Sequence, residues 1–274
     1  MRKIVVLGSN GMLGQMVAKY FILNKYDVTI INERIDEISI FSLIENINKL
    51  EDSIVINCIG KIKQKTGQSA ELLWSNTIWP LELNRSLKDT HFLIHPSTDC
   101  VFSGNKLEFY DDDNMPDAED IYGWSKSLGE VALRNRANTL ILRVSIIGPD
   151  KNSSKGLLSW FLNSEDGGDL FGFSNHAWNG ITTLEWCERL NYLIESENIY
   201  TIKAQNNLIQ LGTSIKYSKA QMLQIFKIVF NKNVRIIEKN EGLGNISKCL
   251  TPMIESKDLE SQLRELKSFM DENP

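Results

Sequence analysis

Short runs of β-branched and apolar residues alternate with longer amphipathic stretches through the first 150 residues, and this alternation most constrains the fold. Nearly every residue in each run is apolar, which is typical of strands buried on both faces. The amphipathic stretches can cover such strands as helices. The pattern therefore predicts an α/β fold with a doubly wound parallel sheet. We expect strands at Lys3–Leu7, Asp27–Ile31, Ser53–Asn57, His91–His95 and Thr139–Val144, and helices at Met12–Leu23, Ile40–Leu50, Ala70–Leu87 and Ser125–Arg134.

The composition excludes several classes of protein. The formal net charge of −5 argues against nucleic-acid binding, because proteins that bind phosphate backbones are usually basic. No apolar run approaches the ~20 residues that span a bilayer, and Ile4–Leu7 is too short for the core of a signal peptide. The four cysteines form no C-x-x-C pair, so we expect neither disulfides nor a metal site, and a cytoplasmic location without membrane binding. We interpret the short basic cluster at Lys61, Lys63 and Lys65 as a solvated loop.

Three glycines follow the first predicted strand and open the first predicted helix. Gly8 permits a sharp turn, Gly11 lets the backbone approach a ligand, and Gly14 lets the helix lie close to the strand. Because helix N-termini attract phosphates, this position favours a dinucleotide site over a plain strand–turn–helix junction, although G-x-x-G-x-x-G differs from the common G-x-G-x-x-G. The predicted fold is thus Rossmann-type, and the candidates for cofactor binding here are Gly8, Asn10, Gly11, Met12, Leu13 and Gly14.

The residues after the second predicted strand bear on the choice of dinucleotide. An acidic residue at this point hydrogen-bonds the adenosine ribose, which favours NAD(H). The chain has Asn32, Glu33 and Arg34 here; Asn32 is uncharged, and Arg34 could pair with a 2′-phosphate. We therefore favour NADP(H) over NAD(H), with Asn32 and Arg34 in the site. A Glu33 that faces the ribose would reverse this preference.

A tyrosine and a lysine stand one helical turn apart at Tyr122 and Lys126. Alone, this spacing is equally consistent with an aromatic beside a surface lysine. Here it follows Thr98, which lies after the fourth predicted strand, at the end where ligands bind in open α/β sheets. An ammonium lowers the pKa of a neighbouring phenol, which could then exchange a proton with a substrate oxygen held by the Thr98 hydroxyl. The catalytic candidates are therefore Thr98, Tyr122 and Lys126.

These motifs occur together in one known order. With them, the chain resembles the extended short-chain dehydrogenases/reductases, and especially the dTDP-4-dehydrorhamnose reductase group. The resemblance covers about the first 150 residues, with a weaker echo at Gly180–Thr182 and 207–212. Its motifs are Gly8–Gly14, Asn57, Asn76, Ser97–Phe102, Tyr122–Glu130 and Leu142–Ser145.

The resemblance implies reduction of a nucleotide-linked 4-keto-6-deoxy sugar at C4, with hydride from a nicotinamide cofactor. Thr98 matches the family's catalytic hydroxyl, Tyr122 its proton donor and Lys126 the partner of that donor, which also contacts the nicotinamide ribose. Such a reductase would supply deoxysugars for a surface polysaccharide. Further residues implied to line the cofactor are Asn57, Cys58, Ile59, Gly60, Asn76 and Ser145.

Two departures from the group pattern fall on the sugar side of the site. Cys100 replaces the aromatic of Ser-Thr-Asp-Tyr, and residues 176–182 lack the usual proline. We interpret both as signs of a different sugar or nucleotide. A nucleophilic role for Cys100 is the alternative, but no base lies near it in sequence. Packing is an equal alternative for Trp178. The candidates for substrate binding are Cys100, Trp178, Asn179 and Thr182.

Other functions share this scaffold. A sugar epimerase would use the same Tyr122 and Lys126 pair, whereas a dehydratase would be expected to show Asp-Glu after Thr98, where this chain has Asp99 and Cys100. A cofactor-binding regulatory subunit without turnover would not need a proton donor, and fold alone cannot separate these functions.

The pattern loosens after Pro149, where polar, glycine-bearing segments separate the helices predicted at Gly156–Leu162, Thr183–Glu195 and Lys219–Phe230. We therefore predict an NAD(P)-binding Rossmann domain at residues 1–150. Residues 151–274 would form mainly a smaller substrate-binding lobe, with a segment near 205–212 returning to the sheet. The oligomeric state stays open, with a homodimer as the candidate, because nothing in the sequence identifies an interface.

Overall fold

A central parallel sheet organises the chain. The structure, a computed structural model, describes residues 3–33, 39–66, 68–150, 156–197, 199, 207–242 and 244–274. Within these residues seven strands pair in the order β2-β1-β3-β4-β5-β10-β14, and every neighbouring pair is parallel. The strands are β1 (Lys3–Leu7), β2 (Asp27–Ile31), β3 (Ser53–Asn57), β4 (Phe92–Pro96), β5 (Thr139–Arg143), β10 (Leu208–Gly212) and β14 (Ile254–Glu255).

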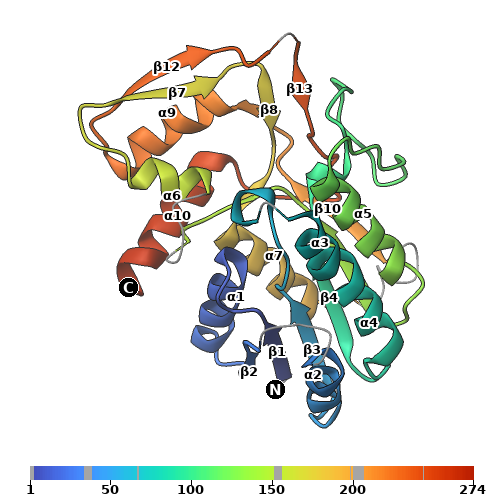
Figure 1. The fold of residues 1–274 in the computed structure, drawn as a ribbon. Coiled ribbons are helices and arrows are strands. Elements are labelled where there is room, and N and C mark those ends of the chain that lie inside the picture. The colour runs from blue at the N-terminus through green and yellow to red at the C-terminus, as the bar shows by residue number, and fades with distance from the viewer. Residues whose placement is uncertain are drawn as a thin grey trace.

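Helices cover both faces of this sheet, which confirms the predicted doubly wound α/β class (Figure 1). Strand β1 shows why, since Ile4 and Val6 join one hydrophobic cluster while Val5 and Leu7 join the other. Side chains alternate between the faces of a strand, so an all-apolar strand needs cover on both. The first cluster includes α1 (Met12–Leu23) and α7 (Thr183–Glu195), and the second includes α2 (Ser39–Asn48), α4 (Trp79–Ser86) and α5 (Ile121–Leu133).

Two helices differ from their predicted bounds. Helix α5 begins four residues earlier than expected, because the Asp120 side chain accepts a hydrogen bond from the Gly123 N–H and caps the helix. The stretch predicted as one helix at Ala70–Leu87 comprises α3 (Ser69–Leu73), a π-helical turn at Trp74–Ile78, and α4. Among the described residues, no helix is long and apolar enough to cross a membrane.

The sheet has a topological switch point between β1 and β3. The chain passes from β1 to β2 on one side, and from β3 to β4 on the other. Ligands of open α/β sheets bind in the crevice beyond the carboxyl ends of the strands at such a point. Gly8 directly follows β1 and Cys58 directly follows β3, so the predicted glycine turn lies at this crevice.

The second half of the chain builds a lobe above the sheet and also returns to it (Figure 1). In the lobe, β7 pairs with β12, and β8 lies between β11 and β13; β10 then extends the sheet beside β5. The predicted domain boundary at residue 150 stays a prediction. The further elements are β6 (Ile146–Ile147), α6 (Leu157–Leu162), β7 (Asp169–Phe173), β8 (His176–Trp178), β9 (Ile181–Thr182), β11 (Tyr217–Ser218), α9 (Lys219–Phe230), β12 (Arg235–Lys239), β13 (Ile246–Ser247) and α10 (Leu259–Glu272).

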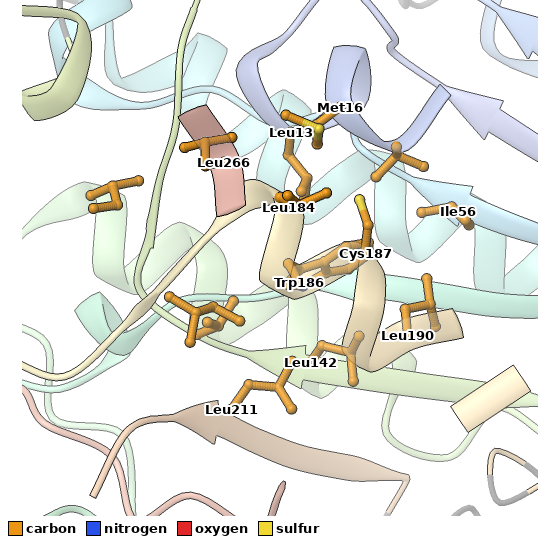
Figure 2. Close-up of a cluster of buried hydrophobic side chains, with 14 of the residues drawn as sticks. Leu13, Met16, Ile56, Leu142, Leu184, Trp186, Cys187, Leu190, Leu211 and Leu266 are labelled. Atoms are coloured by element: carbon orange, nitrogen blue, oxygen red, sulfur yellow. The ribbon is translucent and has the colours of Figure 1, made fainter. Parts of the chain in front are cut away.

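One hydrophobic cluster joins the sheet to the lobe. Figure 2 shows Trp186 and Cys187 of α7 among side chains from α1, β3, β5 and β10, with Leu266 of α10 above them. Trp186 and Leu266 are fully buried, and each such side chain contributes about 1.5–3 kcal/mol of transfer free energy. The lobe therefore shares a continuous core with the sheet, and this core fixes its position over the carboxyl ends of the strands.

Candidate active site

The glycine turn is as tight as its sequence predicts. Gly8 has a φ of +77°, and a Cβ there would lie 2.7 Å from the Ile59 side chain. A Cβ on Gly14 would lie 2.2 Å from the Gly8 carbonyl oxygen, so α1 packs directly on the turn. At Gly11 the nearest atom would be 3.8 Å away, which leaves room beside the helix N-terminus.

These features fit a dinucleotide pyrophosphate. Gly11 is the N-cap of α1 and no side chain caps this helix, so its first N–H groups can receive an anion. Asn10 is exposed at the turn, and Met12 opens the helix beside it. Leu13 points into the core shown in Figure 2, so only its backbone could contact a ligand.

Asn32 connects the end of β2 to the glycine turn. Its side-chain oxygen accepts hydrogen bonds from the Ser9 N–H at 2.7 Å and from the Ser9 hydroxyl at 2.9 Å. The amide therefore stabilises the turn, and its role in cofactor binding stays a prediction. Arg34, the predicted partner of a 2′-phosphate, lies outside the described residues.

Asn57, at the end of β3, is buried in a polar network beneath the crevice. Its side-chain oxygen accepts from the Trp79 indole at 2.8 Å and from the Ile59 N–H at 3.3 Å, and its amide nitrogen lies 3.0 Å from His95 Nδ1. Burial holds the pKa of His95 well below its usual value, so the ring is neutral at physiological pH. Asn57 thus positions the turn at Cys58, Ile59 and Gly60 through buried contacts.

Asn76 links that turn to the helix that carries Tyr122. Lying in the π-helical turn, it accepts from the Lys61 N–H at 3.0 Å and donates to the Lys61 carbonyl at 2.9 Å and the Ser125 hydroxyl at 3.0 Å. The basic cluster is not simply a solvated loop, because Lys61 pairs with Glu71 at 2.6 Å and Lys63 with Asp120 at 2.7 Å. The loop after β3 is therefore held against α3, which carries Glu71, and against α5, which Asp120 caps.

The fold brings the three predicted catalytic residues together beyond β4. Thr98 caps a short 3₁₀ turn at Asp99–Val101, and its hydroxyl is near enough to Tyr122 to lower the pKa of the phenol against the larger, raising effect of burial. The Lys126 ammonium donates to the Pro96 carbonyl at 2.7 Å. A phenol, a hydroxyl and an ammonium thus converge at the carboxyl end of one strand, which suits proton transfer to a substrate oxygen.

The pKa expected for Tyr122 is wrong in direction. Burial raises the pKa of this phenol above its usual value, with the charges of Cys100 and Asp99 adding to the effect. Burial also lowers the pKa of Lys126 to about 8, although the Glu130 carboxylate opposes that change. A phenol protonated at neutral pH can donate a proton but cannot readily accept one.

A buried ion pair fixes helix α5 from its inner face. The sequence alone did not indicate this role. Glu130, one turn after Lys126, accepts from Arg143 Nη2 at 2.7 Å and from Arg143 Nε at 2.9 Å. The Ser97 hydroxyl also donates to Glu130. Because Ser97 adjoins Thr98, this bidentate pair joins β4, β5 and α5 behind the catalytic residues.

Lys248, which no motif indicated, lies at the same cluster from the lobe side. Its side chain passes over Gly104, where a Cβ would lie 3.1 Å from Lys248 Cγ. Its charge lowers the pKa values of Asp99 and Cys100 against the larger, raising effect of burial. The lobe therefore presents a half-buried ammonium beside the Thr98 turn.

The structure separates the four substrate candidates. Cys100 and Trp178 are partly accessible. Asn179 is buried, and its side chain bonds the carbonyls of Thr213 and Leu250, both at 2.8 Å. Thr182 is fully buried and caps α7, so both of these residues have structural roles.

The structure bears on the roles of two further motif residues, Cys100 and Ser145. Burial raises the pKa of the Cys100 thiol to about 12, which argues against a nucleophilic role because the thiolate is the reactive form. The Ser145 side chain lowers the pKa of Asp99 against the larger effect of burial, which places Ser145 beside the catalytic turn. This position is consistent with the chain order, because Ser145 follows the carboxyl end of β5.

One family model matches the chain. The model of the family described as "RmlD substrate binding domain" matches residues 1–165, more than half of the chain. No curated protein matches the sequence.

Solved structures share the fold at low sequence identity. The dTDP-4-dehydrorhamnose reductase from Bacillus anthracis, in complex with NADP, is 17% identical over 100% of both chains, with a TM-score of 0.83. A dTDP-4-dehydrorhamnose reductase from Clostridium acetobutylicum is 16% identical over 98% of this chain and 99% of its own, with a TM-score of 0.79. A dTDP-glucose 4,6-dehydratase from Bacillus anthracis, in complex with NAD, is 14% identical over 100% and 97%, with a TM-score of 0.74.

Proposed function

This chain belongs to the RmlD substrate binding domain family, and we propose that it reduces the C4 ketone of a nucleotide-linked 4-keto-6-deoxy sugar with hydride from NAD(P)H. The observation that carries the proposal is the partly buried Tyr122 phenol near the Thr98 hydroxyl, beyond the carboxyl end of β4. The product would serve deoxysugar biosynthesis for a surface polysaccharide, in the cytoplasm.

The glycine cradle and the α1 N-terminus would hold the cofactor pyrophosphate, and the turn after β3 would border the rest of the cofactor. When bound, the nicotinamide supplies the hydride. Lys126 of α5 would lie beside the nicotinamide ribose, because its ammonium lies at the carboxyl end of β4. The residues after β2 support a preference for NADP(H) through Arg34. Comparing NADPH with NADH before and after Arg34→Ala tests this, and an unchanged preference removes Arg34 from the site.

The chain's own residues would supply the proton. Thr98, whose hydroxyl donates to Asp99 at 3.0 Å, would hold the C4 oxygen through that hydroxyl. Tyr122 would donate its phenolic proton to that oxygen as negative charge develops there. Tyr122 is protonated at neutral pH, as reduction requires of the proton donor. The ion pair between Glu130 and Arg143 fixes the position of α5, and therefore of Tyr122, relative to the Thr98 turn.

The lobe would supply substrate contacts. Lys248 is suited to an anionic group of the nucleotide sugar, because an ammonium beside the Thr98 turn attracts phosphate. Trp178 and Cys100 are the accessible predicted contacts. Where the reductase group has an aromatic, Cys100 leaves a smaller side chain, which supports a sugar or nucleotide different from that group's own.

Two other functions are consistent with the same scaffold. An epimerase would use Tyr122 and Lys126 without net consumption of cofactor, and a regulatory subunit would bind cofactor without turnover. The match to the model of the RmlD family favours the reductase over both.

The experiment is a panel of nucleotide-linked 4-keto-6-deoxyhexoses, made in situ by a dehydratase, with NADPH oxidation followed optically. The proposal predicts oxidation with at least one member. Tight NADPH binding without oxidation of any member would favour the regulatory function, and sugar isomerisation at constant NADPH would favour the epimerase.

A further inference from the structure

The chain contains two Asn-Gly pairs, Asn10–Gly11 and Asn179–Gly180, and the fold places them in opposite surroundings. Asn10 is exposed in the turn before α1, whereas Asn179 is only 3% exposed. An asparagine before a glycine is especially prone to deamidation, because glycine has no side chain to hinder attack by its own backbone nitrogen. The two pairs therefore differ in how readily they can undergo the same reaction.

The surroundings of Gly11 leave room for this reaction. A five-membered ring forms when the Gly11 nitrogen reaches the side-chain carbon of Asn10, so the backbone must turn at this bond. A Cβ on Gly11 would have no atom nearer than 3.8 Å, and the Gly11 N–H makes only a long bond to the Gly8 carbonyl, at 3.3 Å. Because a hydrogen bond of this length lies outside the usual range for N–H···O, it opposes loss of the proton only weakly.

We propose that Asn10 is a site of spontaneous deamidation, and that the product weakens cofactor binding at the glycine turn. In the first step the Gly11 nitrogen bonds to Asn10 Cγ, the bond from Cγ to Nδ2 breaks, and ammonia leaves with the Gly11 amide proton. Water then opens the resulting succinimide at one of its two carbonyls, which yields aspartate or isoaspartate. The reaction consumes only water, which reaches the exposed turn.

The second pair is a control within the same chain. The Asn179 side chain accepts from the Leu250 N–H at 3.0 Å and donates to the Leu250 carbonyl at 2.8 Å. A Cβ on Gly180 would lie 2.0 Å from the Ser145 backbone oxygen, so the backbone has no space to turn here. We expect Asn179 to remain an amide while Asn10 is converted.

The effect on the cofactor rests on the proposed function. Both products place a carboxylate one residue before the N-cap Gly11, where the first N–H groups of α1 would otherwise receive the pyrophosphate. The new charge occupies the positive end of the helix dipole and repels that anion, and isoaspartate also lengthens the backbone of the turn. Deamidation should therefore weaken NADPH binding at least tenfold. Bound NADPH should in turn slow the reaction, because it holds the turn in one conformation.

The first test is the mass of the tryptic peptide that spans residues 4–19, after incubation of the full chain at 37 °C and pH 8. We expect a gain of about one dalton at Asn10, with labelling by an isoaspartate methyltransferase, and no gain at Asn179. A synthetic peptide of residues 4–19 is the reference, since it carries the same Asn-Gly pair without the fold. An Asn10 that stays intact while this peptide reacts would overturn the modification, and so would equal rates at Asn10 and Asn179.

The second test follows NADPH affinity, by fluorescence titration, during the same incubation. The affinity of the wild-type chain should fall as Asn10 converts, while that of Asn10→Ser should stay at its own starting value. Asn46→Ser, at an exposed asparagine on α2, is the matched control and should lose affinity at the wild-type rate.

Two results of this titration would overturn the effect on the cofactor: unchanged affinity after complete conversion of Asn10, or an unchanged rate of conversion in saturating NADPH. A chain that binds no NADPH from the outset would contradict the proposed function and this effect together. The peptide mass would still decide the modification itself, because it does not depend on cofactor binding.

Discussion

A Cβ on Gly123 would lie 2.1 Å from the backbone oxygen of Cys100. The first turn of α5 therefore touches the turn that carries Thr98, with no room for a side chain between them. This contact sets the distance between Tyr122, which precedes Gly123, and the Thr98 hydroxyl. The Asp120 cap lies at the same place, because its hydrogen bond from the Gly123 N–H fixes where the helix begins.

Gly123→Ala should force these two turns apart. Because the clash is with backbone atoms, we expect a loss of several kcal/mol in stability, within the range of other severe overpacking changes, and at least a tenfold loss of kcat. Gly156→Ala is the control, since the nearest atom to its added Cβ would be 3.9 Å away. Urea unfolding and initial rates measure both effects, and equal behaviour of the two variants would show that the contact does not position Tyr122.

Tyr122→Phe should lower turnover at least ~100-fold while cofactor affinity stays within about twofold, because only proton donation is lost. Tyr192→Phe, at an exposed tyrosine on α7, provides the matched control and should keep full turnover. Steady-state rates and a fluorescence titration with NADPH separate the two quantities. Near-normal turnover in Tyr122→Phe would exclude the phenol as proton donor.

Lys126→Met should stabilise the fold while abolishing turnover. The pKa of Lys126 falls from 10.5 to about 8 on folding, so the unfolded chain holds this proton more tightly. The buried ammonium therefore costs about 3 kcal/mol of stability below pH 8, and the cost fades as pH rises toward 10.5. Urea unfolding at pH 7 should show a gain of this order, shrinking by pH 9.5. A loss of stability at pH 7 would contradict this account.

Lys248→Ala should raise the KM for the nucleotide sugar about tenfold or more, with a smaller effect on kcat, because the ammonium would act in binding. Lys88→Ala, at an exposed lysine remote from the site, should leave both constants unchanged. Substrate saturation curves measured at low and at moderate ionic strength check this. An unchanged KM would remove Lys248 from the substrate site.

The sheet could be predicted from the sequence because its strands are apolar runs bounded by turns. Strands β1, β2 and β3 have their expected bounds, as do helices α1, α7 and α9. Three of the lobe strands could not be predicted, because β8, β11 and β13 have two or three residues each, too few for a period to be visible. The early start of α5 was missed because its capping residue, Asp120, lies within an acidic stretch.

The candidate site divides in a similar way. Thr98, Tyr122 and Lys126 could be found because local spacing and motif order carry the signal. The polar networks could not, because Asn57 meets Trp79 and His95 across 22 and 38 positions of the chain. The direction of the Tyr122 pKa was wrong because it depends on burial, which spacing does not reveal. The roles of the site residues stay predictions until they are tested by substitution.

The central claim is hydride transfer to the C4 carbon of a nucleotide-linked sugar. The most direct measurement uses NADPH carrying deuterium at the transferable position of its nicotinamide, with mass spectrometry and NMR of the sugar product. We expect one deuterium bonded to C4 of the new alcohol for each NADPH oxidised, and none in Tyr122→Phe on the same timescale. A product without deuterium at C4, or sugar isomerised without NADPH consumption, would contradict it.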